Sequence, residues 1–314
     1  MPRKIIIDTD PGVDDSMAIF FALCSPELDV IGLTTIFGNV HTELATKNAL
    51  RQLEIAGRAE IPVAQGAVDA LAQPFEGPVP FVHGEDGQGD IFAPDPAGTA
   101  IDLSAAQFII EQLRAHPGEI TLVPVGPLTN IALALRLEPR IADWVDEVVL
   151  MGGNALVPGN ASPAGEANIR NDPEAADVVF GADWQVTMVG LDVTLRVHMR
   201  PEHIDEYAAH GNPMSDHISR ILPHYRNYFE ANYDAEGIFV HDSSAIAYLI
   251  DPALFQVRRW AIRVGRQGLG RGKTWPATGG RLQPAWEGRP LVNVCVGVEG
   301  DKVVALAAER LRNA

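Results

Sequence analysis

Four aspartates follow the first apolar run of the chain within one short turn. The run, residues 5–7, consists of three β-branched side chains, which is typical of a buried strand. The acids that follow it are Asp8, Asp10, Asp14 and Asp15. Like charges this close repel one another unless a cation lies among them, and carboxylate oxygens suit Ca²⁺ or Mg²⁺ better than zinc. The alternative is a solvated turn whose Asp14 or Asp15 caps a helix at residues 16–23, but four acids after a buried strand favour a metal site.

Further polar residues follow later strands or lie in long loops. Asn39 follows the second apolar run and is either a turn residue or a ligand at the same sheet edge as Asp10. His83 lies in a loop, where a histidine is usually just exposed, although the adjacent glycines indicate a close backbone approach. The segment 125–130 reads as a strand end, a turn and a helix start. Here a backbone carbonyl would be the useful group for a hard cation.

Two segments nearer the C-terminus carry groups suited to binding and proton transfer. Residues 160–168 form a loop rich in amides with one carboxylate, Glu166; it is either a solvated loop or a site for hydroxyl groups, because amides both donate and accept. His241 and Asp242 precede an apolar helix. Asp242 either caps that helix or joins the carboxylate cluster, and His241 is suited to proton donation near neutral pH.

Aromatic residues recur at three- and four-residue spacing in a predicted helix: Tyr225, Tyr228, Phe229 and Tyr233. Such a stripe is more often core packing, but at the rim of a site it would stack on a flat ring.

Two motifs resemble phosphate chemistry and fail on inspection. Residues 268–274 look like a P-loop, but the required first glycine is Gln267 and Pro276 blocks the helix that should follow. Residues 8–10 resemble the nucleophile motif of haloacid-dehalogenase-type phosphatases. The lysine that such enzymes need is missing where the strands ending at Val125 and Met151 should supply it.

These residues require a scaffold in which strand ends meet at one edge of a sheet. Apolar β-type runs alternate with helical ones, which predicts an α/β fold with a mixed, mainly parallel central sheet flanked by helices on both faces. The later strands are predicted at residues 30–35, 120–125, 148–151, 186–189, 261–264, 291–296 and 303–306. The helices are predicted at residues 43–56, 105–115, 128–135, 173–180, 216–232 and 243–250. Residues 299–301 resemble a hairpin turn, so the last strand pair is predicted to be antiparallel.

Composition narrows the class of protein. The 314 residues are 46% hydrophobic and carry a net charge of −17, so we expect no nucleic acid or anionic membrane as a partner. The start of the chain has no signal peptide pattern and no run reaches transmembrane length. Cys24 and Cys295 read as reduced core thiols of a cytoplasmic protein. Because the candidate residues span positions 8 to 242, we predict a single domain over residues 1–314.

Taken in order, these motifs resemble the inosine-uridine-preferring nucleoside hydrolases. The resemblance covers almost the whole length, and its most specific part is the opening Asp-Thr-Asp-Pro-Gly-x-Asp-Asp. The other matching pieces are Asn39, the Gly-Pro-Leu-Thr-Asn turn at 126–130, Met151-Gly-Gly, Asn160, Glu166, Asn168, the helix start at 172–176 and His241-Asp242.

The resemblance implies a site and a reaction. It implies a Ca²⁺ ion bound by Asp10, Asp15, Asp242 and the main-chain carbonyl of Val125. It implies that the ribose hydroxyls are held by Asp14, Asn39, Asn160, Glu166 and Asn168. Asp10 would activate water and His241 would protonate the departing base. We also place His83, Met151, Tyr228 and Phe229 in the substrate site.

We therefore expect hydrolysis of ribonucleosides to ribose and free base by a Rossmann-related, cytoplasmic homodimer or homotetramer. Two departures leave the preferred base open: Ala167 stands where many members have phenylalanine, and Gln88 stands where relatives often have an apolar residue. The alternatives are a phosphatase with Asp8 as nucleophile and a nucleoside-binding protein without catalysis.

Overall fold

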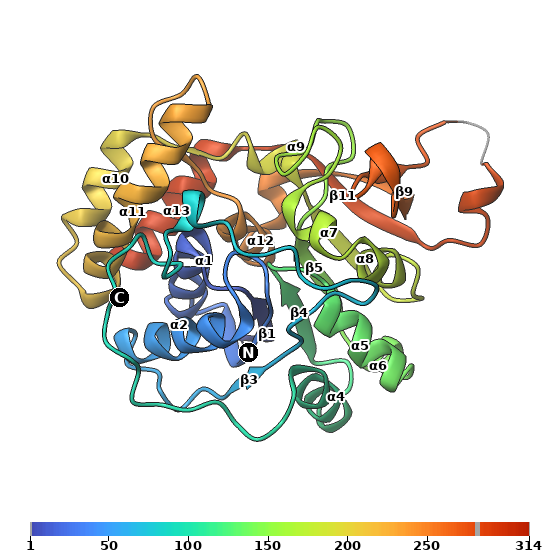
Figure 1. Ribbon diagram of the computed structural model, residues 1–314, viewed down its shortest axis with the longest axis horizontal. Helices are drawn as coiled ribbons and strands as arrows, with labels where there is room; N and C mark the ends of the chain where they lie inside the picture. Colours follow the sequence, from blue (N-terminus) through green and yellow to red (C-terminus); the bar gives the residue numbers. More distant parts are fainter. Residues whose placement is uncertain (1, 280–282, 314) are drawn as a thin grey trace.

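The structure is a computed structural model that describes residues 2–279 and 283–313. Within those residues, a nine-stranded sheet has the order β10-β9-β11-β6-β5-β4-β1-β2-β3 (Figure 1). The strands are β1 (Arg3–Thr9), β2 (Leu28–Thr35), β3 (Val63–Gln65), β4 (Ile120–Pro124), β5 (Val148–Met151), β6 (Val186–Val189), β9 (Phe255–Val264), β10 (Thr274–Pro276) and β11 (Leu291–Val298). Neighbouring strands from β3 to β11 are parallel, whereas β9 runs antiparallel to both β11 and β10. The predicted mixed, mainly parallel sheet is confirmed.

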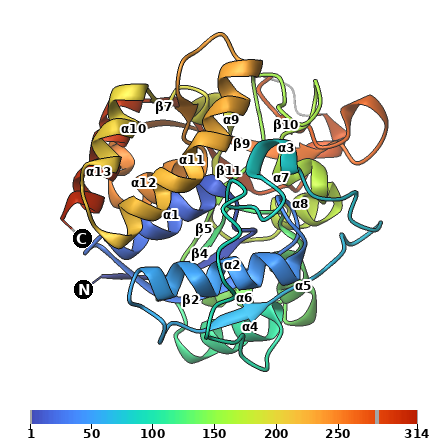
Figure 2. The same ribbon diagram turned by 60° about the vertical axis from the view of Figure 1, so that its left-hand side comes forward.

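Helices cover both faces of this sheet, as predicted. Those sharing one core are α1 (Val13–Leu23), α2 (Thr42–Ile55), α10 (Pro201–Ala208), α11 (Pro213–Asn232), α12 (Asp242–Ile250) and α13 (Gly300–Arg312). Those sharing the other are α4 (Ala105–Ala115), α5 (Thr129–Leu137), α6 (Ile141–Trp144) and α8 (Pro173–Val179). Figure 2 shows α1, α11 and α12 side by side in the first layer. Within β1, Ile5 and Ile7 face this layer and Ile6 faces the other, as the two-residue period of a strand requires.

Short elements complete the described part of the chain. They are the helices α3 (Pro80–His83), α7 (Ala167–Asn171) and α9 (Leu191–Thr194), the strand pair β7 (His198–Met199) and β8 (Ile238–Phe239), and the 3₁₀ turns Pro252–Leu254, Gly268–Gly270 and Pro284–Trp286. None of the described helices combines the length and apolar character needed to cross a membrane. Cys24 and Cys295 are both free thiols.

One predicted strand is wrong. Residues 303–306 belong to α13, and residues 299–301 lead into that helix instead of forming a hairpin turn. The buried side chains of α13 recur with a helical period: Val303, Val304, Ala307, Ala308 and Leu311. The short apolar run was the buried stripe of an amphipathic helix. The sheet is mixed because of the antiparallel strand β9, not because of a final hairpin.

The order of the strands brings the ends of β1 and β4 together. The chain passes from β1 to β2 and β3 on one side, then crosses to β4 on the other side of β1. This is a topological switch point, where open α/β sheets bind ligands at the carboxyl ends of the strands. The amide of Val125, just after β4, donates to the carbonyl oxygen of Asp8 at 2.8 Å. Two long segments between elements of the sheet, residues 66–98 and 152–168, both contribute residues to this edge.

Candidate active site

The aspartate turn is built around Asp15. Helix α1 begins at Val13, three residues before the predicted start, so Asp14 and Asp15 lie in its first turn. The Asp15 carboxylate accepts from Thr9 Oγ1 at 2.6 Å and from the Gly12 amide at 3.0 Å. It also accepts from Asn39 Nδ2 at 2.9 Å, which ties the turn after β2 to the turn after β1.

Asp10 lies deep in this turn with one oxygen free. Its Oδ2 accepts a hydrogen bond from the backbone amide of Asn39 at 2.6 Å, while Oδ1 is buried without a hydrogen-bond partner. Two glycines allow this close packing. A Cβ added to Gly38 would lie 2.0 Å from Oδ2, and one added to Gly126 would lie 2.5 Å from Oδ1.

Three carboxylates form a group that fits a hard cation. Asp14, Asp15 and Asp242 are buried, and one oxygen from each lies within 4.8 Å of the others. The Asp242 side chain does not cap α12, and Asp14 Oδ1 has no hydrogen-bond partner. The group includes two of the three predicted metal aspartates together with Asp14, which was predicted to bind ribose; Asp10 is outside it.

The raised pKa values of these carboxyl groups also favour a bound cation. Burial, reinforced by the neighbouring Asp15 carboxylate, raises the pKa of Asp14 to about 7 and that of Asp10 well above its usual value. Burial and the charge of Asp14 likewise raise the pKa of Asp242. Four buried acids with oxygen-only donors and unsatisfied oxygens are what Ca²⁺ or Mg²⁺ would stabilise, so the residues present fit a divalent cation.

Asn168 joins the ends of β4 and β5. Its Nδ2 donates to the carbonyl oxygens of Val125 and Met151. Glu166 caps α7, accepting from the amides of Asn168 and Ile169 and from that of Gly153. The Glu166 carboxylate is therefore held rigidly by backbone donors, and burial raises its pKa.

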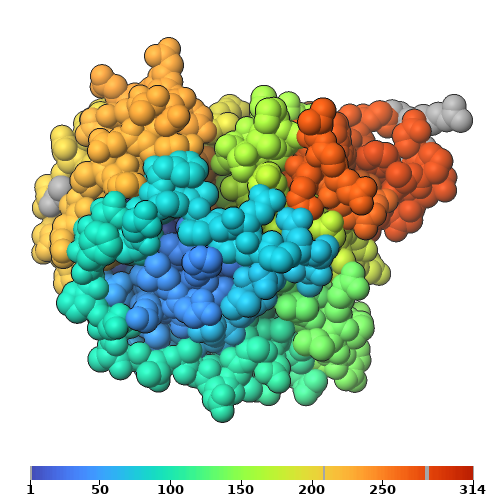
Figure 3. Space-filling view, in the orientation of Figure 1, coloured from blue at the N-terminus to red at the C-terminus, as the bar shows by residue number. Residues whose placement is uncertain are grey.

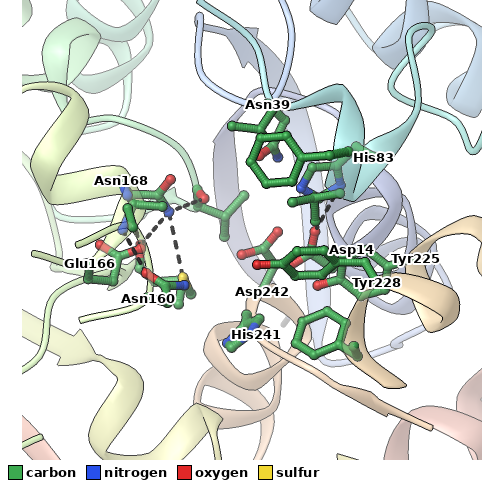
Figure 4. A pocket seen from close by; sticks show the side chains of 18 of the residues that line it. Asp14, Asn39, His83, Asn160, Glu166, Asn168, Tyr225, Tyr228, His241 and Asp242 are labelled. Carbon is green, nitrogen blue, oxygen red and sulfur yellow. Dashed lines mark hydrogen bonds and ion pairs between the residues drawn. The ribbon is translucent and has the colours of Figure 1, made fainter. Parts of the chain in front are cut away.

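These residues surround a cavity of about 140 Å³ (Figure 4). The predicted residues that line it are Asp14, Asn39, His83, Val125, Met151, Asn160, Glu166, Asn168, Tyr228, Phe229, His241 and Asp242. Asp10 and Asp15 are buried outside this lining. Figure 4 shows Asn160, Glu166 and Asn168 on one side, and His83 and Tyr225 on the other.

Two buried histidines line the pocket, each anchored through Nδ1. The Val13 amide donates to His83 Nδ1 at 3.2 Å, and Thr194 Oγ1 lies 2.8 Å from His241 Nδ1. Burial lowers the pKa of His83 to about 3 and that of His241 to about 4. Both imidazoles are therefore neutral near pH 7. Because the Val13 amide can only donate, His83 carries its proton on Nε2, whereas the Thr194 hydroxyl can either donate to or accept from His241 Nδ1.

The aromatic stripe of α11 lines the pocket. Tyr225, Tyr228, Phe229 and Tyr233 all do so, and burial together with the charge of Asp14 raises the pKa of Tyr225. The sequence offered Tyr225 as part of this stripe, but only Tyr228 and Phe229 were assigned to the substrate site. Sequence reasoning missed the lining residues Val79, Phe81, Val82 and Ala161. Phe81 is 65% exposed and its ring centroid is 5.9 Å from that of Tyr228; its place two residues before His83 was the available signal.

The two departures from the family pattern have different positions. Ala167 lines the pocket, whereas Gln88 does not. Gln88 is buried behind the aspartate turn, so it has no contact with a base in the pocket.

The phosphate readings find no support. Asp8 is buried in β1, where it accepts from Thr34 Oγ1 at 2.6 Å and Asn130 Nδ2 at 2.8 Å, and it does not line the pocket. A nucleophile needs access to substrate, which Asp8 lacks. Residues 268–274 form a 3₁₀ turn leading into β10 instead of a loop before a helix, so the rejection of a P-loop is confirmed.

Comparisons with known proteins agree with this geometry. The sequence model of the family described as "Inosine-uridine preferring nucleoside hydrolase" matches residues 5–305. The chain is 45% identical to "Probable uridine nucleosidase 2" of Arabidopsis thaliana, over 98% of this chain and 97% of that protein. The solved structure of the plant nucleoside hydrolase PpNRh1 superposes with a TM-score of 0.96 at 40% identity, covering 99% of both chains. A purine-preferring ribonucleoside hydrolase from Gardnerella vaginalis gives 0.92 at 34% identity, covering 99% of this chain and 98% of that one.

Proposed function

The chain belongs to the inosine-uridine preferring nucleoside hydrolase family and hydrolyses the N-glycosidic bond of ribonucleosides, and we propose that it does so with Ca²⁺ held by Asp10, Asp15, Asp242 and the Val125 carbonyl. The observation that carries this proposal is the group of buried carboxylates beside an aromatic-lined pocket. Because this group contains Asp14 and not Asp10, we assign Asp14 to both the sugar hydroxyls and the charge of the ion, and the unpaired Oδ1 of Asp10 supports its assignment as a further ligand.

The reaction adds water at the anomeric carbon of ribose while the bond from that carbon to the base nitrogen breaks. The base leaves with the electron pair of that bond, and positive charge develops on the sugar. Asp10 takes a proton from the attacking water as a general base. Asp14 and Glu166 supply negative potential where the positive charge develops. When bound, the ion supplies Lewis acidity and orients the sugar hydroxyls.

The sugar is fixed by amide and carboxylate groups on opposite sides of the pocket. We assign Asn39 to one side and Asn160 and Asn168 to the other. Amides both donate and accept, so each suits a hydroxyl group. Binding the two ring hydroxyls at once orients the anomeric carbon toward the attacking water.

His241 delivers a proton to the departing base. Burial lowers its pKa to about 4, so it waits as a neutral imidazole held by Thr194. A neutral imidazole is a weak acid, so transfer from Nε2 accompanies the build-up of negative charge on the base. Tyr228 and Phe229 offer flat rings for the base to stack on and exclude water from it. His83 and Met151 complete the binding surface.

We propose that the enzyme is a homodimer or homotetramer that uses the face of β9, β10 and β11 bearing Val257, Trp275 and Leu291. These side chains are 37%, 46% and 51% exposed, and the strand register places all of them on the same face. Figures 1 and 3 show this part of the chain projecting from the body. Exposed apolar side chains gathered on one face are what a second copy would cover.

We assign the enzyme to the cytoplasm, where a reducing environment suits its two free thiols.

Activity is tested by reducing-sugar release from a panel of purine, pyrimidine and 2′-deoxy nucleosides, in chelator and after Ca²⁺ or Mg²⁺ is added back. We expect ribose and free base, loss of turnover in chelator, recovery with Ca²⁺ and slow turnover of the deoxy substrates. Full activity without a divalent ion, or equal turnover of 2′-deoxynucleosides, would contradict the proposal.

A further inference from the structure

Gln88 makes an unusual set of contacts for a residue outside the pocket. Its side chain is 1% exposed, and Nε2 lies 3.3 Å from the Pro11 carbonyl oxygen and 3.1 Å from that of Gly12. Nε2 is also 3.1 Å from Ser16 Oγ and 2.9 Å from the carbonyl oxygen of Gly87. The amide therefore connects the loop after α3 to the turn between Asp10 and α1.

A buried histidine fixes the orientation of this amide. His217 Nε2, on α11, lies 2.9 Å from Gln88 Oε1. Because Oε1 can only accept, His217 must carry its proton on Nε2, and the Gln88 amide nitrogen must then face the turn carbonyls. His217 is 5% exposed and its ring meets Phe20 edge-on at a centroid distance of 6.0 Å, so its own position is fixed by packing.

The carbonyls that Gln88 holds lie between the acids of the site. Pro11 and Gly12 follow Asp10 directly and precede Asp14 and Asp15. The Gly12 carbonyl also accepts from Ser16 Oγ at 2.6 Å, inside α1. Gln88 thus acts on the turn from outside the helix and without lining the pocket. An apolar side chain of the same length would leave these buried carbonyls with fewer donors.

We propose that Gln88 is a positioning residue: with its amide oriented by His217, it holds the Pro11–Gly12 turn so that Asp10, Asp14 and Asp15 stand in the arrangement that binds the metal. This inference rests on the metal site proposed above. Partners behind a metal ligand typically change metal affinity by about 10-fold to 100-fold when removed. Gln88 would act less directly, because it contacts the backbone beside the ligands and not the ligand side chains.

The test compares Gln88→Met with Gln52→Met. Gln52 is also fully buried and its Nε2 donates to Ser16 Oγ at 2.6 Å, but among the described residues it makes no hydrogen bond to the turn carbonyls. Calorimetric titration of the metal-free proteins with Ca²⁺ is expected to show a dissociation constant about 10-fold higher for Gln88→Met and nearly unchanged for Gln52→Met. Ribose release at saturating Ca²⁺ should recover most of the Gln88→Met activity, because excess ion compensates for weaker binding.

A purely structural role gives a different pattern. It would lower the melting temperatures of the metal-free and Ca²⁺-loaded forms equally, with the dissociation constant unchanged, and that result would overturn the proposal. Wild-type protein that binds no Ca²⁺ would instead refute the metal site itself.

His217→Leu provides a second route should Gln88→Met fail to fold. It removes the closer of the two donors to Gln88 Oε1, leaving Ser16 Oγ at 3.3 Å, without changing a residue of the turn. We expect the Ca²⁺ dissociation constant to rise less than in Gln88→Met. The dissociation constant of the double variant should be no higher than that of Gln88→Met alone, because the two residues act as one unit. An unchanged affinity in His217→Leu, or additive effects in the double variant, would remove His217 from the proposal.

Discussion

The side-chain nitrogen of Asn168 lies 2.7 Å from the carbonyl oxygen of Val125. The same nitrogen donates to the Met151 carbonyl at 3.1 Å, so one amide joins the ends of two neighbouring strands at the floor of the pocket. Both carbonyl-bearing residues line the cavity, and Asn168 itself is 9% exposed. The carbonyl proposed to face the cation is thus held in place by a residue proposed to bind the sugar.

Replacing that amide should affect stability and activity together. Asn168→Leu keeps the approximate volume but leaves two buried carbonyls without this donor, so we expect a loss of about 1–3 kcal/mol in the free energy of unfolding. Urea denaturation in chelator measures it, and ribose release should also fall. Asn232→Asp, at the exposed end of α11, is the control and should change stability by less than about 0.5 kcal/mol. An unchanged unfolding free energy in Asn168→Leu would show that water replaces the amide.

Asp10→Asn should separate activity from stability. The general base is lost, so we expect turnover to fall by about 100-fold or more. Because burial raises the pKa of the Asp10 carboxyl, a neutral amide should raise the melting temperature of the metal-free protein at neutral pH. Ribose release and thermal melting in chelator check the two outcomes. Retained turnover would remove Asp10 from the base role.

His241→Ala should depend on the leaving group. Natural nucleosides release a base that needs a proton, whereas p-nitrophenyl riboside releases a stable anion. We expect a loss of about 100-fold or more on nucleosides and a much smaller loss on the nitrophenyl substrate. Thr194→Val, which removes the hydroxyl beside His241 Nδ1, should show the same preference more weakly. Equal losses on both substrates would exclude proton donation by His241.

The stabilisation by Ca²⁺ should depend on pH. The Asp14 carboxyl has a pKa of about 7 in the metal-free fold against 3.8 in a model peptide, so its contribution to stability is complete below about pH 4 and is lost as the pH rises through about 7. Bound Ca²⁺ replaces those protons. The rise in melting temperature on adding Ca²⁺ to dialysed protein should therefore be large near pH 8 and shrink towards about pH 5.

The lowered pKa values of His83 and His241 act in the opposite sense, because a buried neutral histidine loses stability as the pH falls. This effect is present in both the metal-free and the Ca²⁺-loaded protein, so it largely cancels in the difference between their melting temperatures. A Ca²⁺-induced shift in melting temperature that stays constant over this range would contradict the competition between protons and the ion.

We predict that the enzyme assembles through the exposed face of β9, β10 and β11. Leu291→Asp places a charge on the face proposed to meet a second copy, and we expect the mass measured by light scattering to fall to that of one chain. Leu137→Asp is the matched control, because Leu137 is 66% exposed at the end of α5, away from that face, and should leave the mass unchanged. A Leu291→Asp protein that keeps its wild-type oligomeric mass would place the interface elsewhere.

The sheet could be predicted because its strands carry short apolar runs with turn residues after them. The prediction of a strand at residues 303–306 was wrong for a physical reason. Four residues of Val, Ala and Leu fit a strand or one helical turn equally well, and only the later apolar residues Ala307, Ala308 and Leu311 distinguish a helix from a strand. The start of α1 was placed three residues late because the acids were read as caps. In fact Asp15 closes the first turn by accepting from Gly12.

The site could be predicted as a set of residues but not as an arrangement. Every predicted substrate residue lines the cavity, because motifs at strand ends must meet at one edge of the sheet. Spacing cannot reveal which oxygens come together, so the grouping of Asp14 with Asp15 and Asp242 required coordinates. Gln88 shows the same limit: its departure from the apolar residue of many relatives suggested an effect on base preference, but its loop turns the amide to the carbonyls of the aspartate turn.

Asp15 and Asp242 stand far apart in the sequence, yet their oxygens lie within 4.8 Å. Any ion they share is a cross-link that closes a loop containing most of the polypeptide. Closing a loop costs more entropy as the loop grows, and the ion would oppose this cost in the folded state while neutralising the buried carboxylates. When the ion is removed, the buried carboxylates it held repel one another, so the first turn of α1, which carries Asp14 and Asp15, is the place where amide exchange should first accelerate.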